Sequence, residues 1–273
     1  MKIISFTKMA GAGNDFVIVD NRSGILGANP AGSARKLCDR KRSIGADGLV
    51  LLEKSKKAEL RMRIFNPDGS EAEMCGNGVR CLAKLAADKK ITKRKMSIET
   101  AAGIVTVEVR KNIVKARLTD PRDLKLNFSV NVNGGPKNLN FIDTGVPHAV
   151  MVLDSLEDTD VSGLGKEICF HPHFAPQGTN VDFISFKKAG GTPNAIEIRT
   201  YERGIESETL SCGTGSTAGA LVAAALKGYP SPVFVKTESG EILKVYFSRK
   251  GGRFYDVYLE GPVTVSFEGS VNL

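Results

Sequence analysis

The chain has 273 residues, of which 41% are hydrophobic and 25% charged, and its formal net charge is +8 at pH 7. This composition is typical of a globular protein with two domains, and no apolar run approaches the roughly 20 residues of a membrane-spanning helix. The N-terminal residues become polar too early for a signal peptide, so we expect a cytoplasmic protein. The basic stretches carry neither interleaved aromatic residues nor a nucleic-acid motif, which favours a solvated surface and no nucleic-acid partner.

Most of the chain predicts antiparallel β-strands separated by Gly, Asn or Pro turns. Alternating or β-branched runs place strands at residues 3–8, 16–20, 49–52, 60–65, 104–109, 114–118, 149–153, 181–186, 195–200, 233–236, 242–247, 255–259 and 263–267. Helical patterns are few: one covers residues 30–41 and two others follow Cys75 and Cys212, with apolar residues at i, i+3, i+4 and i+7. The helix after Cys212 is apolar nearly all round, which predicts burial within a wrapping sheet.

The two halves of the chain resemble each other. Residues 13–18 (GNDFVI) are similar to residues 179–184 (TNVDFI), and Cys75 has a counterpart in Cys212, although the spacing from motif to cysteine is much longer in the first half. We therefore predict an α+β fold of two pseudo-symmetric domains, each a mainly antiparallel sheet wrapped around a central helix, with the active site in the cleft between them.

The polar, turn-rich residues 120–136 are the predicted domain boundary. This prediction gives an N-terminal domain of residues 1–120 with a returning strand at 262–273, and a C-terminal domain of residues 121–261.

Two of the five cysteines open a Gly-rich turn into a helix. Cys75 lies in EMCGNG (residues 73–78) and Cys212 in LSCGTG (residues 210–215). A helix N-terminus lowers the pKa of a nearby thiol, so the sequence predicts two thiols that ionise near neutral pH. Such a matched acid–base pair suits the transfer of a proton from one face of a carbon to the other. Three cysteines lack this context and are predicted to be buried apolar residues: Cys38, Cys81 and Cys169.

The turns after the two cysteines also predict an anion site. The backbone N–H groups near Gly76, Asn77, Gly213 and Thr214 open two helices, and helix N-termini that converge on one carboxylate would bind it. Their glycines let the backbone approach closely. A plain helix-start turn is the alternative for either motif taken alone.

Cofactor and metal motifs are weak in this sequence. No lysine stands in a context that identifies it as a pyridoxal anchor, and neither a Walker loop nor a complete dinucleotide fingerprint follows a strand. His171 and His173 could give two metal ligands, but no pattern completes that site, so we expect no metal. A Cys–His hydrolase that uses His148 is an alternative, but it would leave the second Cys-Gly motif unexplained.

At these motifs the chain resembles the diaminopimelate epimerase family, over nearly its whole length. The matching motifs occur in order at residues 8–16 (KMAGAGNDF), 44–48 (IGADG), 65–70 (FNPDGS), 73–80 (EMCGNGVR), 178–181 (GTNV), 201–204 (YERG) and 212–215 (CGTG). The resemblance implies a cofactor-independent isomerase of two pseudo-symmetric α+β domains. Its reaction would interconvert LL- and meso-diaminopimelate for the biosynthesis of lysine and of peptidoglycan precursors.

The resemblance also implies roles for individual residues. Cys212 would accept the proton from the LL substrate and Cys75 would donate one, with these roles exchanged in the reverse reaction. The substrate-binding residues would be Asn14, Asn66, Gly76, Asn77, Asn180, Glu202, Arg203, Gly213 and Thr214. His148 and Glu202 would tune the pKa values of the thiols, while for His148 a purely structural role is the alternative. These residue types fit an amino-acid substrate, since arginine binds carboxylates bidentately and carboxylate or amide oxygens accept from ammonium.

Two positions depart from the family pattern. Gly48 stands where the family often has Gln, and Val146 where it often has Asn, and both positions commonly hold the distal head of the substrate. A related racemase of another polar amino acid is therefore the alternative within this class. Phe267 falls where the family carries an aromatic residue at its dimer contact, which predicts a homodimer, with a core position of that ring as the alternative. Proteins of other classes would be an inactive amino-acid-binding protein or a basic nucleic-acid-binding module.

Overall fold

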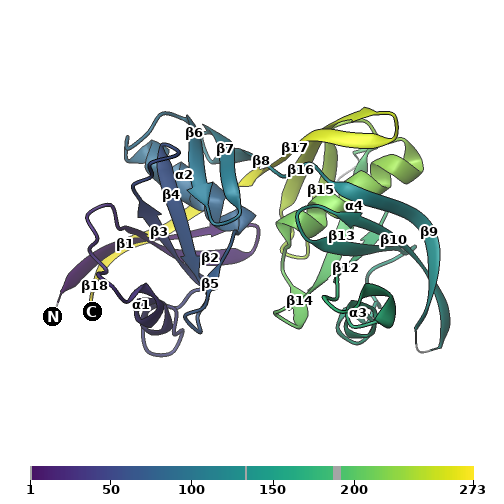
Figure 1. The fold of residues 1–273 in the computed structure, drawn as a ribbon, viewed down its shortest axis with the longest axis horizontal. Helices are drawn as coiled ribbons and strands as arrows, with labels where there is room; N and C mark the ends of the chain where they lie inside the picture. The colour runs from purple at the N-terminus through teal and green to yellow at the C-terminus, as the bar shows by residue number, and fades with distance from the viewer. Residues whose placement is uncertain (1, 133, 187–191) are drawn as a thin grey trace. The chain divides into compact units, whose positions relative to one another are not determined.

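The computed structural model describes residues 2–132, 134–186 and 192–273. Contacts divide the chain into two compact units, one formed by Met1–Ala116 with Gly261–Leu273 and the other by Arg117–Glu260 (Figure 1). Each unit is a mainly antiparallel sheet with one long helix buried against it. The predicted α+β class is therefore confirmed, whereas the bounds of the two domains as folding units stay a prediction.

Unit 1 contains nine described strands and two helices. These are β1 (Ile3–Gly11), β2 (Asn14–Asp20), α1 (Pro30–Leu37), β3 (Gly48–Glu53), β4 (Leu60–Phe65), β5 (Glu71–Ala72), α2 (Gly76–Asp88), β6 (Lys95–Thr100), β7 (Gly103–Arg110), β8 (Ile113–Arg117) and β18 (Thr264–Asn272). The strands pair in the order β18-β1-β2-β3-β4-β6-β7-β8, and β5 adds to β4. Only the pairs β2–β3 and β4–β6 are parallel among these described pairings.

Unit 2 repeats this arrangement. Its elements are β9 (Arg122–Val132), β10 (Gly135–Asp143), β11 (Pro147–Val152), α3 (Val161–Cys169), the short 3₁₀ helix η1 (Pro172–Phe174), β12 (Asn180–Ser185), β13 (Ala195–Glu202), β14 (Ser207–Thr209), α4 (Gly213–Lys227), β15 (Val233–Lys236), β16 (Ile242–Lys250) and β17 (Arg253–Pro262). The strand order is β9-β10-β11-β12-β13-β15-β16-β17, and β14 adds to β13. The pairs β11–β12 and β13–β15 are parallel.

The two central helices are buried because apolar residues occupy nearly every turn. In α2 the predicted stripe of Val79, Leu82, Ala83 and Ala86 is at most 1% exposed. In α4 every residue from Gly215 to Ala224 is buried, as its all-round apolar sequence predicts. At Gly219 an added Cβ would lie 3.0–3.2 Å from isoleucine side chains of the sheet, so the glycine lets α4 pack closely. Burial of this kind fixes the N-terminus of each helix relative to its own sheet.

The topology corrects the predicted internal repeat. Matching the two strand orders makes β11 the counterpart of β2, and β12 the counterpart of β3. The similarity between residues 13–18 and 179–184 therefore compares β2 with β12, which occupy different places in their units. Both segments are buried strands that follow a polar turn, and that shared requirement explains the sequence similarity. With β3 matched to β12, the intervals to Cys75 and Cys212 become similar in length, so the spacing mismatch disappears.

The predicted boundary at residues 120–136 is wrong about local structure. Most of this stretch is β9, which pairs with β10 in a hairpin inside unit 2. Apolar residues alternate with polar ones along β9, from Leu124 through Leu126, Phe128 and Val130 to Val132, and this alternation was the available signal for a strand. The strands β6 and β10 are also absent from the sequence prediction.

Helix α3 is a further element that the sequence pattern did not predict. Two glycines within nine residues weaken the helical signal. Asp160 caps the helix by accepting from the Gly163 N–H group at 2.9 Å. At Gly165 an added Cβ would lie 2.4 Å from Tyr201 Cβ, so this glycine lets α3 pack directly against β13. The glycine that weakens the local propensity is therefore required by the tertiary packing.

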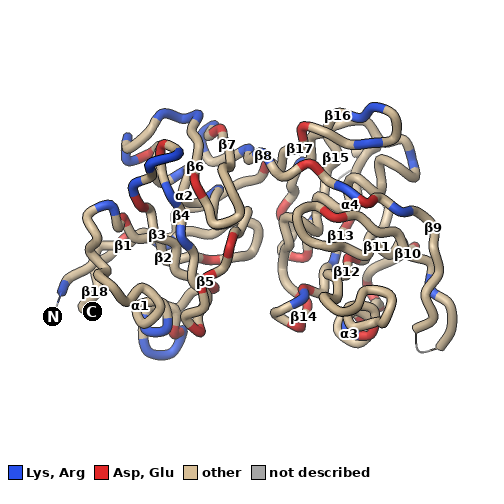
Figure 2. Tube along the Cα trace, in the orientation of Figure 1, with Lys and Arg blue, Asp and Glu red and all other residues tan. Residues whose placement is uncertain are grey.

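Two properties of the whole chain complete this description. Figure 2 shows Lys and Arg along many loops and strands of both units rather than in one segment. Across the described ranges, no helix combines the length and the apolar character needed to cross a membrane.

Candidate active site

Cys75 occupies the N-cap position of α2. Its backbone is extended, with φ −141° and ψ 117°, and its carbonyl oxygen accepts from the Val79 N–H group at 2.9 Å. The side chain is half-buried. Gly76 follows as the first helical residue, and an added Cβ there would meet nothing within 4 Å. The thiol therefore lies at the positive end of a helix whose first turn is open to approach.

A chain of hydrogen bonds joins α2 to β2 beside this thiol. Arg80 Nη2 donates to Asn77 Oδ1 at 2.6 Å, and Asn77 Nδ2 donates to Asn14 Oδ1 at 2.7 Å. Asn14 Nδ2 in turn donates to Asp47 Oδ2 at 3.2 Å. Two predicted binding residues are thus in direct contact. Arg80 and Asp47 lie within motifs that matched the family, yet the sequence reasoning gave them no role.

Asn66 lies apart from this chain of hydrogen bonds. It follows β4 in a turn in which its backbone N–H group donates to the Ser70 carbonyl oxygen at 2.8 Å, and its Nδ2 donates to Ser70 Oγ at 2.9 Å. Gly69 has a φ of +86° in this turn, a conformation that favours glycine. The turn keeps Asn66 exposed. Within the described residues, no hydrogen bond connects it to Asn14 or Asn77.

Cys212 holds the corresponding place at the N-cap of α4. Its Sγ accepts from the Gly215 N–H group at 3.4 Å and lies 3.3 Å from Thr214 Oγ1. The Thr214 carbonyl oxygen accepts from Thr144 Oγ1 at 3.1 Å, which ties the first turn of α4 to the loop after β10. Cys212 is 8% exposed. Gly213 and Thr214, the predicted carboxylate-binding residues, are half-buried beside it.

The protonation state of Cys212 contradicts the sequence expectation. Burial raises the pKa of this thiol well above its ordinary value, and the negative charges of Glu202 and Asp182 raise it further. Hydrogen bonds from Thr214 and Gly215 lower the pKa but do not reverse the shift. The helix N-terminus is present as predicted, yet desolvation outweighs it. In this structure Cys212 is therefore a thiol at neutral pH.

Glu202 ends β13 and is also shifted toward its neutral form. Burial raises the pKa of this carboxyl, and the charge of Asp182 adds to that rise. The Thr209 hydroxyl, which donates to Glu202 Oε2 at 3.1 Å, and the nearby His148 lower the pKa. Thr209 belongs to β14, the short strand that leads toward Cys212. Glu202 and Cys212 are thus electrostatically linked acidic groups.

Arg203 and Asn180 form a second pair of predicted binding residues in direct contact. The Arg203 backbone N–H group donates to Asn180 Oδ1 at 2.9 Å, while Asn180 Nδ2 donates to the Pro147 carbonyl oxygen at 3.1 Å. Arg203 Nη1 donates to the carbonyl oxygens of Gln177 and Gly178 at 2.9 and 3.2 Å. These bonds use one edge of the guanidinium group and fix its direction.

His148 is fully buried and contacts a residue that the sequence analysis passed over. Its Nδ1 lies 2.7 Å from Asp182 Oδ2, and Asp182 Oδ1 accepts from Thr200 Oγ1 at 2.7 Å. Asp182 is itself 0% exposed. It stands in the TNVDFI motif, where it was read as part of a strand. A charged residue within an otherwise apolar buried strand was the available signal.

The residues predicted to have no catalytic role are placed as expected. Cys38, Cys81 and Cys169 are at most 2% exposed, which confirms their interpretation as buried apolar residues. His171 contacts the Asn131 carbonyl oxygen through Nε2 at 3.0 Å and accepts from the His173 N–H group through Nδ1, and His173 stacks on Phe128. Both histidines therefore have structural contacts.

Phe267 is 49% exposed, so the alternative of a core aromatic residue is wrong. Its ring lies edge-on to that of Phe6, with the ring centroids 5.9 Å apart.

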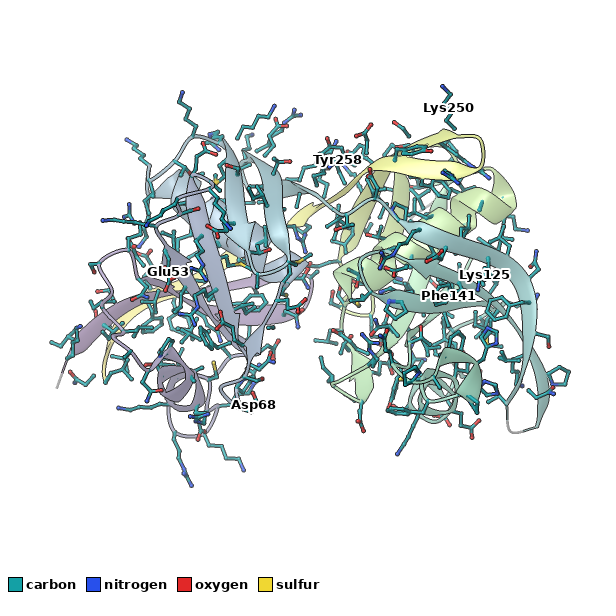
Figure 3. The ribbon with its side chains drawn as sticks, viewed as in Figure 1. Glu53, Asp68, Lys125, Phe141, Lys250 and Tyr258 are labelled. Atoms are coloured by element: carbon teal, nitrogen blue, oxygen red, sulfur yellow. The ribbon has the colours of Figure 1, made fainter. Side chains whose placement is uncertain are left out.

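A cavity of about 210 Å³ lies in unit 2 close to the Arg203 segment. Figure 3 shows two residues of its lining, Lys125 on β9 and Phe141 on β10, next to each other. The rest of the lining is Pro147, His173, Phe174, Ala175, Pro176, Gln177 and Gly178. Because the carbonyl oxygens of Gln177 and Gly178 hold Arg203, the cavity wall also supports that side chain.

This fold occurs in solved structures of very different sequence. A PhzF-family phenazine biosynthesis protein of Bacillus anthracis has a TM-score of 0.75 at 18% identity, with 100% of both chains covered. A hydroxyproline epimerase of Agrobacterium vitis, solved with bound trans-4-OH-L-proline, has a TM-score of 0.67 at 17% identity, covering 99% of this chain and 92% of that one. The chain thus has the two-domain PhzF-like fold, to which racemases and epimerases also belong.

Sequence comparison then gives the family. The sequence model for diaminopimelate epimerase matches residues 6–122 and 140–265. The diaminopimelate epimerase of Aquifex aeolicus (strain VF5) is 41% identical over 282 residues, covering 98% of each chain. That of Hydrogenobaculum sp. (strain Y04AAS1) is 40% identical over 279 residues, covering 97% of this chain and 98% of the relative. The chain belongs to the diaminopimelate epimerase family and is an isomerase.

Proposed function

We propose that this protein converts LL-2,6-diaminopimelate to the meso isomer without a cofactor, with Cys75 and Cys212 as the acid and the base. One thiolate removes the α-proton, and the electron pair of the C–H bond passes into the α-carboxylate. The other thiol then delivers a proton to the opposite face of the same carbon. Charge and protons balance, because one thiolate and one thiol enter and leave in exchanged positions.

The observation that carries this proposal is the equivalence of the two cysteines. Each is the N-cap of the long helix buried against its own sheet, and α2 follows β5 in the chain as α4 follows β14. Each is followed by a glycine at the first helical position, where backbone N–H groups have no partner within the helix. Two such helix starts supply donors for the negative charge that develops on the substrate carboxylate.

The raised pKa of Cys212 fits this chemistry if the substrate itself changes the local charge. The negative charges of Glu202 and Asp182 hold Cys212 in its protonated form. We assign Glu202 to the ammonium group of the substrate, and the positive charge of that group offsets the carboxylate. The pKa of Cys212 then falls when substrate binds, so the thiolate that accepts the LL proton forms only in the complex. Glu202 thereby tunes the thiol as well as binding substrate.

We assign the remaining predicted residues to substrate binding. Gly76, Asn77, Gly213 and Thr214 hold the reacting carboxylate through the helix starts. Asn14, Asn66, Asn180 and Arg203 hold the distal amino-acid head, where the guanidinium group of Arg203 binds its carboxylate. In support, the contact of Asn14 with Asn77, and that of Asn180 with Arg203, pre-set the direction of these polar groups. Pre-set groups lose less conformational entropy when the substrate binds.

A racemase of another polar amino acid is the second candidate, and two positions favour it. Gly48 begins β3, where an added Cβ would lie 3.1 Å from the Phe65 carbonyl oxygen, so a long side chain at this position meets a tight backbone. Val146 offers an apolar side chain where an amide would bind a carboxylate or ammonium group. A substrate with a shorter or less polar distal end would need fewer donors from these positions.

Proton NMR of the reduced protein in D₂O distinguishes these candidates. LL-diaminopimelate should lose its α-proton signal while the meso isomer accumulates, in parallel with a panel of single amino acids that should not exchange. Exchange of another amino acid alone would keep the two-thiol chemistry and reassign the substrate. No exchange in folded, reduced protein would contradict the proposed function, and ligand-induced thermal stabilisation would then indicate a binding protein.

We further propose that the enzyme works in the cytoplasm as a homodimer and that its product feeds lysine and peptidoglycan-precursor biosynthesis. A cytoplasmic location suits the thiol chemistry, because reducing conditions keep both cysteines in the thiol form. Mild oxidation tests this requirement, since two thiols that serve one carbon come within reach of each other. Loss of both thiols together with activity, reversed by a reductant, is the expected result.

A further inference from the structure

A buried carboxylate lies behind the Cys212 site, and the proposed chemistry uses only its charge. Asp182 is 0% exposed in β12, between a histidine and a threonine that are 0% and 2% exposed. Its Oδ2 lies 2.7 Å from His148 Nδ1, and its Oδ1 accepts from Thr200 Oγ1 at 2.7 Å. Burial of a carboxylate is unfavourable unless each oxygen is paired, and here each oxygen is paired.

The position of Asp182 is fixed from the side of α4 as well. At Gly215 an added Cβ would lie 2.3 Å from Asp182 Oδ1, so the carboxylate lies directly against the first turn of that helix. The positive end of the helix favours a negative charge there. Gly215 is also the residue whose N–H group donates to Cys212 Sγ. The carboxylate, the helix start and the thiol therefore form one packed group.

These contacts decide which nitrogen of His148 carries the proton. A carboxylate can only accept hydrogen bonds, so the nitrogen that faces it must be the protonated one. Nδ1 of His148 then carries a hydrogen, and in the neutral imidazole Nε2 keeps its lone pair. His148 Nε2 is buried and has no hydrogen-bond partner among the described residues. A buried acceptor without a hydrogen-bond partner destabilises the folded state. The unpartnered Nε2 therefore indicates that a group other than Asp182 and Thr200 donates a proton to it.

We propose, on the basis of the proposed function, that Asp182 is a positioning residue that holds His148 as the Nδ1–H tautomer and so presents Nε2 as a proton acceptor for an ammonium or thiol proton. The other acidic groups that face this pair are Glu202 and Cys212, and the negative charge of Asp182 raises the pKa of both. Thr200 holds the second carboxylate oxygen. Asp182 acts through His148 and touches no reacting atom.

The tautomer can be observed without any assay of activity. The chain has three histidines, so His171→Gln together with His173→Gln leaves His148 as the only one. Long-range proton–nitrogen correlation on ¹⁵N-histidine-labelled protein should show a protonated Nδ1 and a bare Nε2 at neutral pH. A protonated Nε2, whether Nδ1 is bare or also protonated, or averaging between the two tautomers, would overturn the proposal. This measurement stands even if diaminopimelate is not the substrate, so its failure and that of the proposed function are distinguishable.

The kinetics of three variants on the wild-type background then test whether turnover depends on Asp182. Asp182→Asn removes the charge with little change of shape and should lower kcat about 10²-fold or more, with KM within about threefold of wild type. Thr200→Val loses only the second contact of the carboxylate and should lower kcat less.

Ser185→Ala is the matched control, since Ser185 lies buried in the same strand and its hydroxyl has no hydrogen-bond partner in the described structure. It should keep wild-type kcat. Unchanged kcat in Asp182→Asn would overturn the proposal, and so would an equal loss in Ser185→Ala. In Asp182→Asn the long-range correlation should also show a smaller population of the Nδ1–H tautomer of His148. General destabilisation of the fold would not produce this change.

Discussion

Asn77 Nδ2 donates a hydrogen bond to Asn14 Oδ1 across 2.7 Å and so joins the first turn of α2 to the start of β2. The two residues at the ends of this chain of hydrogen bonds determine which amide groups donate and which accept. Arg80 has only donors and holds Asn77 Oδ1, while the Asp47 carboxylate has only acceptors and holds Asn14 Nδ2. A rotation of either amide by half a turn would place two donors or two acceptors against each other. The two polar side chains beside Cys75 are therefore oriented before substrate arrives.

Asn77→Asp tests this orientation. The substitution places a carboxylate oxygen against Asn14 Oδ1, so the acceptors repel and the contact between α2 and β2 is lost. We expect kcat/KM to fall about 10- to 100-fold and the free energy of unfolding to fall by about 1–3 kcal/mol. The α-proton exchange rate and urea denaturation measure these two quantities. Asn138→Asp makes the same change on an exposed residue of β10 and should alter neither.

Serine at either of the two proposed catalytic cysteines should nearly abolish turnover. Cys75→Ser and Cys212→Ser replace a thiol with a hydroxyl that does not ionise near neutral pH, so we expect losses of at least about 10²- to 10⁴-fold in kcat. The fold should persist, since serine is a favoured N-cap residue at the start of a helix. Circular dichroism and the exchange assay give both quantities. Cys38→Ala, in the core of unit 1, is the control and should keep kcat. Near wild-type turnover in either serine variant would rule out the two-thiol mechanism.

Glu202→Gln should lower the pKa of Cys212. The negative charge of Glu202 is one cause of the raised pKa of this thiol, so its removal makes the thiolate more accessible. We expect iodoacetamide to modify Cys212 several-fold faster at pH 8 in substrate-free Glu202→Gln than in wild type, as measured by peptide mass spectrometry. Glu206→Gln removes an exposed charge from the same hairpin and should leave the rate unchanged. An unchanged rate in Glu202→Gln would contradict the assigned electrostatic coupling.

The stability of the protein should decrease above pH 9. Burial raises the pKa of the Cys38 thiol to about 11, whereas a thiol in the unfolded chain ionises at about 8.5. The folded state therefore binds more protons between these values, and the free energy of unfolding must fall as pH rises through that window. The contribution is fully present below about 8.5 and lost by about pH 11. Cys169 and Cys212 change in the same direction, because their pKa values are also raised.

Urea midpoints measured from pH 7 to 11 test this effect. Cys38→Ala removes one of the three thiols, so its midpoint should fall less steeply than that of wild type over this range. Parallel curves for the two proteins would show that Cys38 ionises equally in both states.

Phe267 should contribute to a homodimer contact. The ring is 49% exposed beside Phe6, and Val265 on the same strand, β18, is a second exposed large hydrophobic residue. Light scattering at micromolar concentration should give twice the chain mass of 29.3 kDa, and Phe267→Asp should shift the protein toward the single-chain mass. Tyr255→Asp changes another exposed aromatic residue and should leave the mass unchanged. A single-chain mass for the wild type would remove the dimer proposal.

Local sequence predicts α2 and α4 well because their apolar residues repeat at helical spacing and each follows a Cys-Gly turn. Most strands are also predictable, since one face is buried and the residues alternate. Helix α3 and strand β9 were missed for different reasons. In α3 the packing of Gly165 against Tyr201 requires a residue that weakens the helical signal, so a partner distant in sequence determines the structure. Strand β9 was predictable from local sequence, because its apolar residues from Leu124 to Val132 alternate with polar ones, and the prediction of a turn-rich boundary overlooked this pattern.

The sequence by itself determined the family motifs, the two helix-start cysteines and the class of chemistry, because these depend on residue identity and short spacing. Only the tertiary structure decided that β12 is the counterpart of β3, that Asp182 is the buried partner of His148, and that Cys212 is a thiol at neutral pH. The physical reason is that each of these depends on burial and on contacts between segments far apart in the chain. Desolvation of Cys212 outweighs the effect of its helix, and no local pattern encodes that balance.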